Sequence, residues 1–237
     1  MYLKLRSFTS FTPLLALVIC SVTPCVYSWG PNGHAVVATI AQIYTRPAAL
    51  NSVCQLLSPG ETSLTLSPCS LASVASWADT NKGQMLWSAP LHYVGAVNDK
   101  PPNACAFPGP NGWNGQPGVN VFAGIHNTSQ ILLDWASHGS NGPSVGLATE
   151  ALKFIIHFFG DVQMPLHLTG FLRGGNQAAV CLNGEKENLH YVWDNLLPDH
   201  AIAQVPGIYT HSLPPGSKDL FSDINMTLMS VALFGKG

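Results

Sequence analysis

Two histidine–aspartate pairs in the second half of the chain have a spacing that could hold metal ions. His157 and Asp161 are four residues apart, and so are His190 and Asp194. On a helix, residues four apart share one face, so each pair can present an imidazole and a carboxylate to one ion. This mixture of ligands suits zinc. A single such pair is more commonly a helix-surface pair, but both are embedded in apolar residues, where an unpaired carboxylate is costly.

Other histidine and aspartate residues could complete the same site. His167 comes ten residues after His157, so a chain that turns back after the helix would bring it to the cluster. Asp79, His92 and His34 are in the first half of the chain. Taken singly, each is more commonly a helix cap or a core histidine. Together with the two pairs they give eight side-chain ligands, which are too many for one ion and predict a cluster of two or three zinc ions.

The elements that would position these residues are predicted to be helices. Apolar residues recur at helical spacing in HAVVATIAQIY, RPAALNSVCQLL, SLASVASWADT, TSQILLDWASH and SVGLATEALKFIIHFFGDVQM. A further helix is expected through ENLHYVWDNLL. Strand-type alternation is hardly visible, and residues 101–118, rich in glycine and proline, are expected to form a long surface loop. The predicted fold class is all-α, a mainly helical single domain with long irregular loops.

The first 28 residues have the character of a secretory signal peptide. Lys4 and Arg6 precede an apolar run that ends in small residues. A membrane span would need about 20 apolar residues. Cleavage after Ser28 would leave residues 29–237 as one domain, and the protein is expected to be secreted, monomeric and without a membrane anchor.

The charge of residues 29–237 argues against binding nucleic acid through basic patches. Charged residues make up 9% of the chain, against about 25% in a typical protein. Without Lys4 and Arg6, eight basic and twelve acidic side chains give a net charge of −4. Basic side chains normally supply most of the non-specific affinity for nucleic acid. If nucleic acid is the substrate, metal ions and stacking must supply that affinity instead.

Four cysteines follow the signal peptide and are expected to form two disulfides in an oxidising compartment. They are Cys54, Cys69, Cys105 and Cys181. None of them has the C-x-x-C spacing of a zinc site, and the spacing does not choose among the three possible pairings. Two sequons, which begin at Asn127 and Asn225, could carry glycans.

Several short motifs resemble those of the S1/P1 nucleases, the secreted zinc-dependent single-strand nucleases of fungi and plants. The motifs are, in this order, WGPNGH, SWADT, LHYV, HFFGDVQMPLH with TGFLRGGN, and NLHYVWDN. They cover the chain from Trp29 to about Pro198. The resemblance implies a mainly helical fold around a trinuclear zinc site. It also implies hydrolysis of single-stranded DNA and RNA to products with 5′ phosphates, and activity on 3′-nucleotides.

The resemblance further implies how nine metal-binding residues are shared among three Zn²⁺ ions. The ligands of the first ion would be Asp79, His92, His157 and Asp161. Those of the second would be His34, the bridging carboxylate of Asp161, and the amine and carbonyl oxygen of Trp29. Those of the third would be His167, His190 and Asp194. Cleavage before Trp29 would therefore create a metal ligand, and Asp161 is also expected to be catalytic.

Four residues are expected to contact the substrate. Tyr93 resembles the stacking aromatic of the family, which would explain a preference for single strands, because only an unpaired base can enter a pocket and stack. Asn195 matches a position that contacts phosphate or water and is expected to be catalytic. Some members have a base-reading aspartate where this chain has Gly95, and Asp99 and Lys100 are the candidates to replace it.

Two alternatives stay open on the sequence alone. Zinc-dependent phospholipases C have a similar cluster and also begin with tryptophan, although the RGGN and WDN motifs favour a nuclease. The chain also stops earlier than members of the family, which continue for several dozen residues with another helix. The sequence is therefore expected to be shortened at its C-terminus, and it could be an inactive secreted zinc-binding protein.

Overall fold

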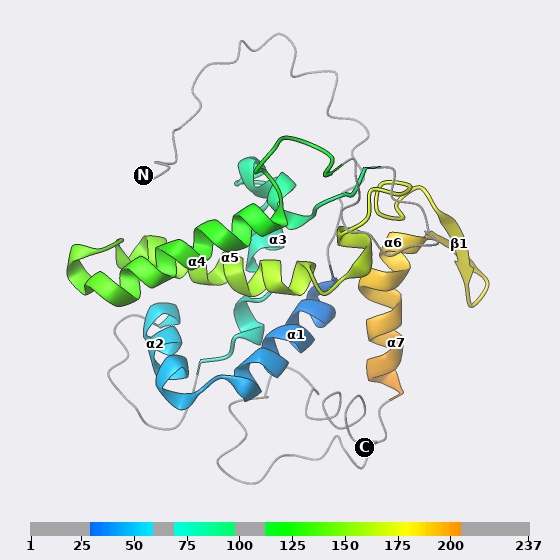
Figure 1. Cartoon of the computed structure of the whole chain (residues 1–237). Helices are drawn as coiled ribbons and strands as arrows, with labels where there is room; N and C mark the ends of the chain where they lie inside the picture. The colour runs from blue at the N-terminus through cyan, green and yellow to red at the C-terminus, as the bar shows by residue number, and fades with distance from the viewer. Residues whose placement is uncertain (1–28, 59–68, 98–111, 205–237) are drawn as a thin grey trace.

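The computed structural model describes residues 29–58, 69–97 and 112–204, and these are mainly helical (Figure 1). The longer helices are α1 (Pro31–Tyr44), α2 (Pro47–Leu57), α4 (Val121–His138), α5 (Val145–Asp161) and α7 (Leu197–Ala203). The short helical elements are η1 (Ala72–Val74), α3 (Trp77–Asn81), η2 (Leu86–His92), η3 (Gly139–Asn141), η4 (Pro165–His167), α6 (Leu189–Tyr191) and η5 (Val192–Leu196). The strands β1 (Ala179–Leu182) and β2 (Glu185–Asn188) form one antiparallel hairpin. The predicted mainly helical fold is confirmed.

Some of the sequence predictions concern residues outside the described part of the chain. These are the signal peptide (1–28), Asp99, Lys100, Cys105, Asn225 and residues 101–111 of the expected loop. Residues 112–118 of that loop have only bends, turns and one isolated bridge, as expected. Asn127 is exposed on α4, and Cys181 is exposed and forms no disulfide with a described cysteine. None of the described helices combines the length and the hydrophobicity that crossing a bilayer requires.

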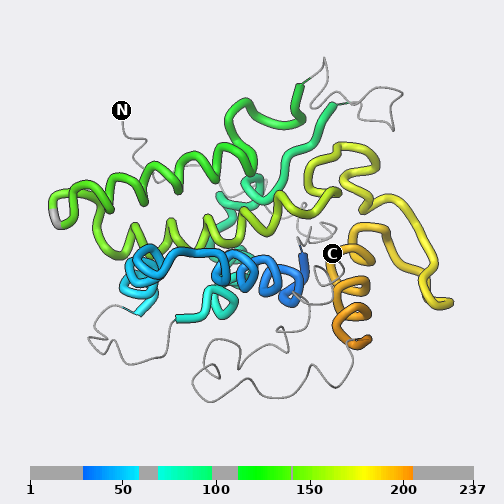
Figure 2. Tube along the Cα trace, turned by 60° about the horizontal axis from the view of Figure 1, so that its bottom comes forward, coloured from blue at the N-terminus to red at the C-terminus, as the bar shows by residue number. Residues whose placement is uncertain are grey.

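Helix α5 is the centre of the fold, because it packs against α1, α2, α3 and α4. Helices α4 and α5 run side by side, as both views show (Figures 1 and 2). Val121 of α4 and Phe154 and Phe158 of α5 belong to the buried core. Burying an apolar side chain of this size stabilises the fold by about 1.5–3 kcal/mol. The helix that carries His157 and Asp161 is therefore firmly held.

Both ends of α5 follow from local sequence. Ser144 caps the helix, because its side chain accepts a hydrogen bond from the backbone N–H three residues later. The helix was expected to continue to Met164 but ends at Asp161. Met164 is extended (φ −94°, ψ 112°), because the residue before a proline, here Pro165, is sterically pushed out of the helical region. Asp161 therefore lies where the chain turns back towards His167.

The β hairpin corrects the expectation of a helix from Glu187. Residues up to Asn188 pair with β1, and the helix begins only at Leu189. The connecting turn is Asn183-Gly184, with φ values of 54° and 89°. Asn-Gly is the favoured sequence for a type I′ turn, which needs two positive φ values. The hairpin signal was thus present, but four-residue strands are too short to show alternation.

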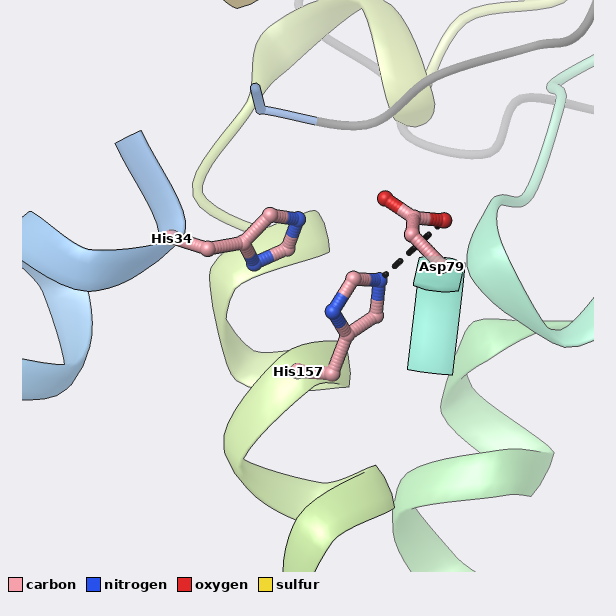
Figure 3. A group of neighbouring side chains, drawn as sticks. All are labelled: His34, Asp79 and His157. Carbon is pink, nitrogen blue, oxygen red and sulfur yellow. Dashed lines mark ion pairs between the residues drawn. The ribbon is translucent and has the colours of Figure 1, made fainter. Parts of the chain in front are cut away.

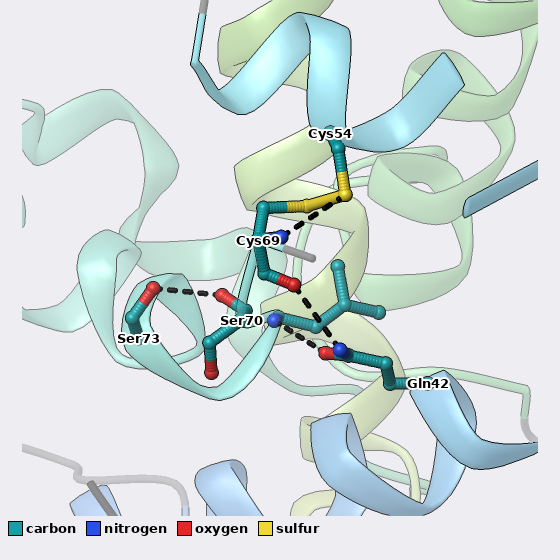
Figure 4. The surroundings of a disulfide bond; sticks show 6 residues. Gln42, Cys54, Cys69, Ser70 and Ser73 are labelled. Carbon is teal, nitrogen blue, oxygen red and sulfur yellow. Dashed lines mark hydrogen bonds between the residues drawn. A yellow bond between two sulfur atoms is a disulfide. The ribbon is translucent and has the colours of Figure 1, made fainter. Parts of the chain in front are cut away.

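A disulfide between Cys54 and Cys69 anchors the segment that leads to the first aspartate of the site (Figure 4). The side chain of Gln42 on α1 also fixes this segment, because it donates a hydrogen bond to the Cys69 carbonyl (3.1 Å) and accepts one from the Leu71 N–H (2.8 Å). The two cysteines are 15 residues apart, a loop for which chain entropy gives a stabilisation of about 3 kcal/mol. The pairing that the sequence left open is settled for these two cysteines.

The residues after Cys69 form two short helical elements in place of the continuous helix expected over residues 70–80. Ser76, between η1 and α3, has φ −95° and ψ 8°, outside the regular helical range. The break allows the carbonyl of Ala75 to accept a hydrogen bond from His157 Nδ1 (2.6 Å). It also sets Asp79 in the first turn of α3.

Candidate metal centre

The eight histidines and aspartates proposed from the sequence gather at one place in the structure. They form three groups, two of which share His157, and within each group the potential ligand atoms lie within 4.8 Å of one another. The groups are His34, Asp79 and His157; His92, His157 and Asp161; and His167, His190 and Asp194. His167 Nδ1 lies 3.6 Å from Asp161 Oδ1, which places the third group beside the other two.

Helix α5 contributes His157 and Asp161, and the other side chains come from α1 and from short helical elements. Figure 3 shows His34 of α1 and Asp79 of α3 pointing towards His157 of α5. The imidazoles of His34 and His157 are stacked with centroids 3.9 Å apart, and His157 Nε2 lies 3.6 Å from Asp79 Oδ1. Residues far apart in the chain are therefore brought together by packing on α5.

The two oxygens of Asp161 face different partners. Oδ2 lies 3.3 Å from His92 Nδ1 and 3.5 Å from His157 Nε2. Oδ1 lies 3.6 Å from His34 Nε2. A carboxylate whose oxygens point to two separate sets of imidazoles has the geometry that bridging two metal ions requires.

Backbone carbonyls orient three of the imidazoles. In each case Nδ1 lies 2.6 Å from a carbonyl oxygen: His157 with Ala75, His167 with His92, and His190 with Gly174. An Nδ1–H that donates to a carbonyl leaves Nε2 as the basic nitrogen, and such outer contacts are typical of metal-ligating histidines. Sequence reasoning missed these carbonyls, since a backbone acceptor carries no side-chain signature.

A π-helical segment, η5, positions Asp194 and draws the start of α1 to the site. In an α-helix the Asp194 carbonyl would bond the N–H of residue 198, but Pro198 has none. The carbonyl instead accepts a hydrogen bond from the Gly30 N–H (2.7 Å). A side chain at Gly30 would overlap the Asn195 amide oxygen. The structure thus places Asn195 beside Gly30, next to Trp29.

Burial shapes the protonation of the site. It raises the pKa of Asp194 to about 8 and the pKa of Asp161 well above its usual range. Burial also lowers the pKa values of His34 and His92 well below 6.5. Both carboxylate oxygens of Asp161 and Asp194 and both ring nitrogens of His34 are buried without hydrogen-bond partners. Such atoms are costly unless a cation satisfies them, so this donor set fits metal ions.

Zinc binding at pH 7 is expected to release at least one proton from the folded chain, because a ligand carboxyl group that is protonated in the metal-free protein must ionise. Burial raises the pKa of Asp194 to about 8, so this carboxyl group is largely protonated at pH 7 in the absence of metal, whereas burial lowers the pKa values of His34 and His92 and keeps these imidazoles neutral. Calorimetric zinc titrations in buffers of different ionisation enthalpy measure this number. Asp194→Asn should release about one proton fewer. Proton release that vanishes above pH 6.5 would point to histidine and contradict the prediction.

The same shifts set the sign of the pH effect on the metal-free protein. The carboxyl pKa values lie above the unfolded value of about 3.9, so the folded state binds more protons than the unfolded state. Their contribution to stability is therefore present below about pH 4 and is lost as the pH rises through the folded pKa, about 8 for Asp194. The lowered histidine pKa values act in the opposite sense below about pH 6.5.

Gly160→Ala is expected to destabilise the protein by about 1–3 kcal/mol through overpacking and to lower its zinc content. Alanine normally stabilises a helix relative to glycine, but a Cβ at Gly160 would overlap the imidazole of His34. His34 is stacked on His157 and cannot yield without disturbing it. Thermal unfolding and elemental analysis measure both effects. The control is Gly146→Ala on the same helix, where a Cβ meets no atom within 4 Å; equal behaviour of the two variants would contradict the argument.

Three further residues were predicted to belong to the site, and the structure shows where each of them lies. Tyr93 is 42% exposed and lines a pocket that His190 also lines. Asn195 is not among the residues that line this pocket. The ring of Trp29 packs against Gly33, and its indole nitrogen is buried without a partner.

Sequence reasoning also missed one charged side chain next to the site. Lys82 Nζ lies 3.9 Å from Asp79 Oδ1, one helical turn further on, and both are partly buried. The available signal was the spacing of three residues between an acidic and a basic side chain, which pairs them on a helix. The ammonium lies within ion-pair distance of the Asp79 carboxylate and can help to orient it.

The fold and the site together define a class: helical proteins with clustered histidine and aspartate side chains, mostly buried, that could hold metal ions. Comparison with known proteins makes this specific. The sequence profile of the S1/P1 Nuclease family matches residues 29–228, and the chain belongs to this family.

Several family members are similar over most of the chain. It is 36% identical to Nuclease S1 of Aspergillus oryzae over 202 residues, 83% of this chain and 62% of that protein. It is 36% identical to Nuclease P1 of Penicillium citrinum over 178 residues, 73% and 60% of the two chains. It is 31% identical to Endonuclease 2 of Arabidopsis thaliana over 196 residues, 81% and 63%. The matched region thus spans about three fifths of the length of these relatives.

Proposed function

We propose that this chain is a secreted, zinc-dependent endonuclease that hydrolyses single-stranded DNA and RNA to products with 5′ phosphates and also acts on 3′-nucleotides. The observation that carries the proposal is the position of Asp161, whose two oxygens face separate sets of imidazoles at the end of α5. Relatives named as nucleases and endonucleases support the same reaction class.

Three zinc ions would be bound, and Asp161 would be a ligand of two of them. The first would be held by Asp79, His92, His157 and Asp161, whose facing atoms lie 3.0–3.6 Å apart. The second would be held by Asp161 with His34 and the backbone of Trp29, and the third by His167, His190 and Asp194. Histidine nitrogen and carboxylate oxygen are the ligands that zinc prefers. When bound, zinc supplies a Lewis acid for the phosphodiester and lowers the pKa of water towards about 7.

The protein's own residues would bind and orient the strand. Tyr93 is fixed between two ligand segments: the His92 carbonyl accepts from His167 Nδ1 (2.6 Å), and the Val94 N–H donates to the His167 carbonyl (2.8 Å). Its ring is left exposed at the pocket. A base stacked on such a rigid ring would hold the adjoining phosphate at the metal centre. Only an unpaired base can do this, since extruding a paired base costs a few kcal/mol.

The test of this function is a zinc count combined with a comparison of substrates. Purified protein should contain three zinc ions by elemental analysis, should cut denatured DNA and RNA faster than duplex DNA, and should lose activity in EDTA. Cleavage of phosphatidylcholine in place of nucleic acid would identify a phospholipase. Fewer than three zinc ions without hydrolysis of any of these substrates would identify an inactive zinc-binding protein.

A further inference from the structure

The pocket beside the metal centre is lined by polar side chains that can donate hydrogen bonds, and none of its described lining residues is an aspartate or a glutamate. It has a volume of about 180 Å³. Its polar side chains, among the described residues, are Tyr93, Asn114, Thr169, Arg173 and His190. Arg173 is the only one that always carries a charge, and a guanidinium has five N–H donors and no acceptor. A ligand that turns acceptor atoms towards Arg173 is therefore favoured.

Two glycines that line the pocket, Gly95 and Gly170, leave room for the side-chain amide of Asn114. A Cβ at Gly170 would overlap both Asn114 Nδ2 and the carbonyl of Ala96, and a Cβ at Gly95 would lie 3.0 Å from Asn114 Nδ2. The backbone N–H of Asn114 donates to the Gly95 carbonyl (2.6 Å), which fixes this residue in place. Gly95 and Gly170 both line the pocket together with Tyr93 and Arg173, so no side chain from these two positions narrows it.

A left-handed turn presents Arg173 at the pocket. Four consecutive residues, from Leu172 to Gly175, have φ values of 47°, 54°, 62° and 80°. This conformation costs a residue other than glycine about 1–2 kcal/mol and persists only where the surroundings impose it, often at functional sites. Here the Gly175 N–H bonds the Phe171 carbonyl (3.1 Å), and the Gly174 carbonyl bonds His190 Nδ1 (2.6 Å). The turn that contains Arg173 is therefore hydrogen-bonded to His190, a predicted metal ligand. Figure 2 shows this yellow segment, before β1, beside the start of α6.

The guanidinium of Arg173 is available to a ligand. The side chain is exposed and makes no ion pair or hydrogen bond with any other described residue. Its backbone is held, because its carbonyl accepts from the Asn176 side chain (2.9 Å) and its N–H donates to Gly170 (3.2 Å). The backbone of Arg173 is therefore held in place, while its guanidinium can still donate hydrogen bonds to a ligand in the pocket.

We propose that Arg173 makes this pocket prefer guanine over adenine in the strand that the enzyme cuts. The inference rests on the proposed nuclease function and adds the base class to it. Guanine presents two adjacent acceptors, O6 and N7, which match the guanidinium fork; adenine presents N7 beside the N6 amino group, which repels one N–H of the fork. Both purines can stack alike on Tyr93, so the difference lies at this edge.

The test compares bases that differ only at that edge. The catalytic efficiency (kcat/KM) is measured on the dinucleotides d(GpG), d(IpI), d(ApA) and the 7-deazaguanine analogue. Guanine is expected to exceed adenine by at least about fivefold, the lower end for a bidentate contact, because Arg173 is exposed. Inosine, which retains O6 and N7, should behave like guanine, and 7-deazaguanine should lose most of the advantage. Equal efficiencies for guanine and adenine would overturn the proposal.

Variants and a binding measurement separate the base contact from other roles. Arg173→Ala and Arg173→Lys should both lose the guanine preference, because lysine keeps the charge but not the fork. Arg46→Ala, at an exposed position before α2, should keep it. Equal loss on guanine and adenine in Arg173→Ala, with recovery in Arg173→Lys, would identify a phosphate contact and overturn the proposal.

Calorimetric binding of the 5′-monophosphates of guanosine and adenosine to the zinc-loaded protein tests the preference without turnover. Guanosine 5′-monophosphate should bind more tightly to the wild type but not to Arg173→Lys. Absence of hydrolysis with a retained binding difference would refute only the nuclease function. Hydrolysis without any base preference would refute only the role of Arg173.

Discussion

The Asp161→Asn variant is expected to lose more than about 100-fold in its rate on single-stranded DNA, since even residues that only orient metal ligands contribute 10–100-fold. It is also expected to lose zinc. An amide has one acceptor oxygen and an NH₂ group in place of the second oxygen. One of the two sets of imidazoles, with nitrogens 3.3–3.6 Å from Asp161, would then face an N–H donor in place of a ligand.

The control is Asp134→Asn on α4, the same chemical change at a partly exposed carboxylate that pairs with His138. Surface ion pairs contribute about 0–1 kcal/mol, so this variant should keep its zinc and its rate. Initial rates and zinc content are measured on both proteins, with thermal unfolding to show that each is folded. Comparable losses in the two variants would remove the bridging role of Asp161.

The sequence predicts those parts of the site that depend on local geometry. The pairs His157/Asp161 and His190/Asp194 are readable because the spacing of four residues alone sets a shared helical face. Their burial is also readable, from the apolar residues that flank them. The part contributed by His34 and other residues of the first half depends on how those segments pack on α5, and spacing carries no information on that. For these residues, the expectation that they belong to the site depends on the family motifs.

The structural features that the sequence did not predict arise where backbone groups find distant partners. The π-helical segment at Asp194 follows from the missing N–H of Pro198 together with an incoming donor, Gly30. The left-handed conformation of Arg173 is unfavourable locally and is imposed by contacts with another element, through Gly174. Local propensity therefore points away from both conformations.

The last prediction concerns the first residue of the proposed mature chain. One extra residue before Trp29, as in a protein that begins Met-Trp29, is expected to make the enzyme nearly inactive. An α-amine with a pKa of about 7.7–8 readily gives up a proton to a metal, whereas an amide nitrogen has neither a free lone pair nor a proton that ionises near neutral pH. The Gly30 N–H, bonded to the Asp194 carbonyl (2.7 Å), holds this backbone beside the site. The zinc ion shared with His34 should then bind weakly.

Three proteins test this idea: the secreted form cleaved before Trp29, the Met-extended form, and Trp29→Ala with the same cleavage. N-terminal sequencing, zinc content and the rate on single-stranded DNA are measured on each. The alanine variant should keep much of the activity, because the proposed ligands are backbone atoms and the indole mainly packs against Gly33. Full activity and full zinc content in the Met-extended form would show that Trp29 is only a packing residue, since a side chain tolerates upstream residues and a terminal amine does not.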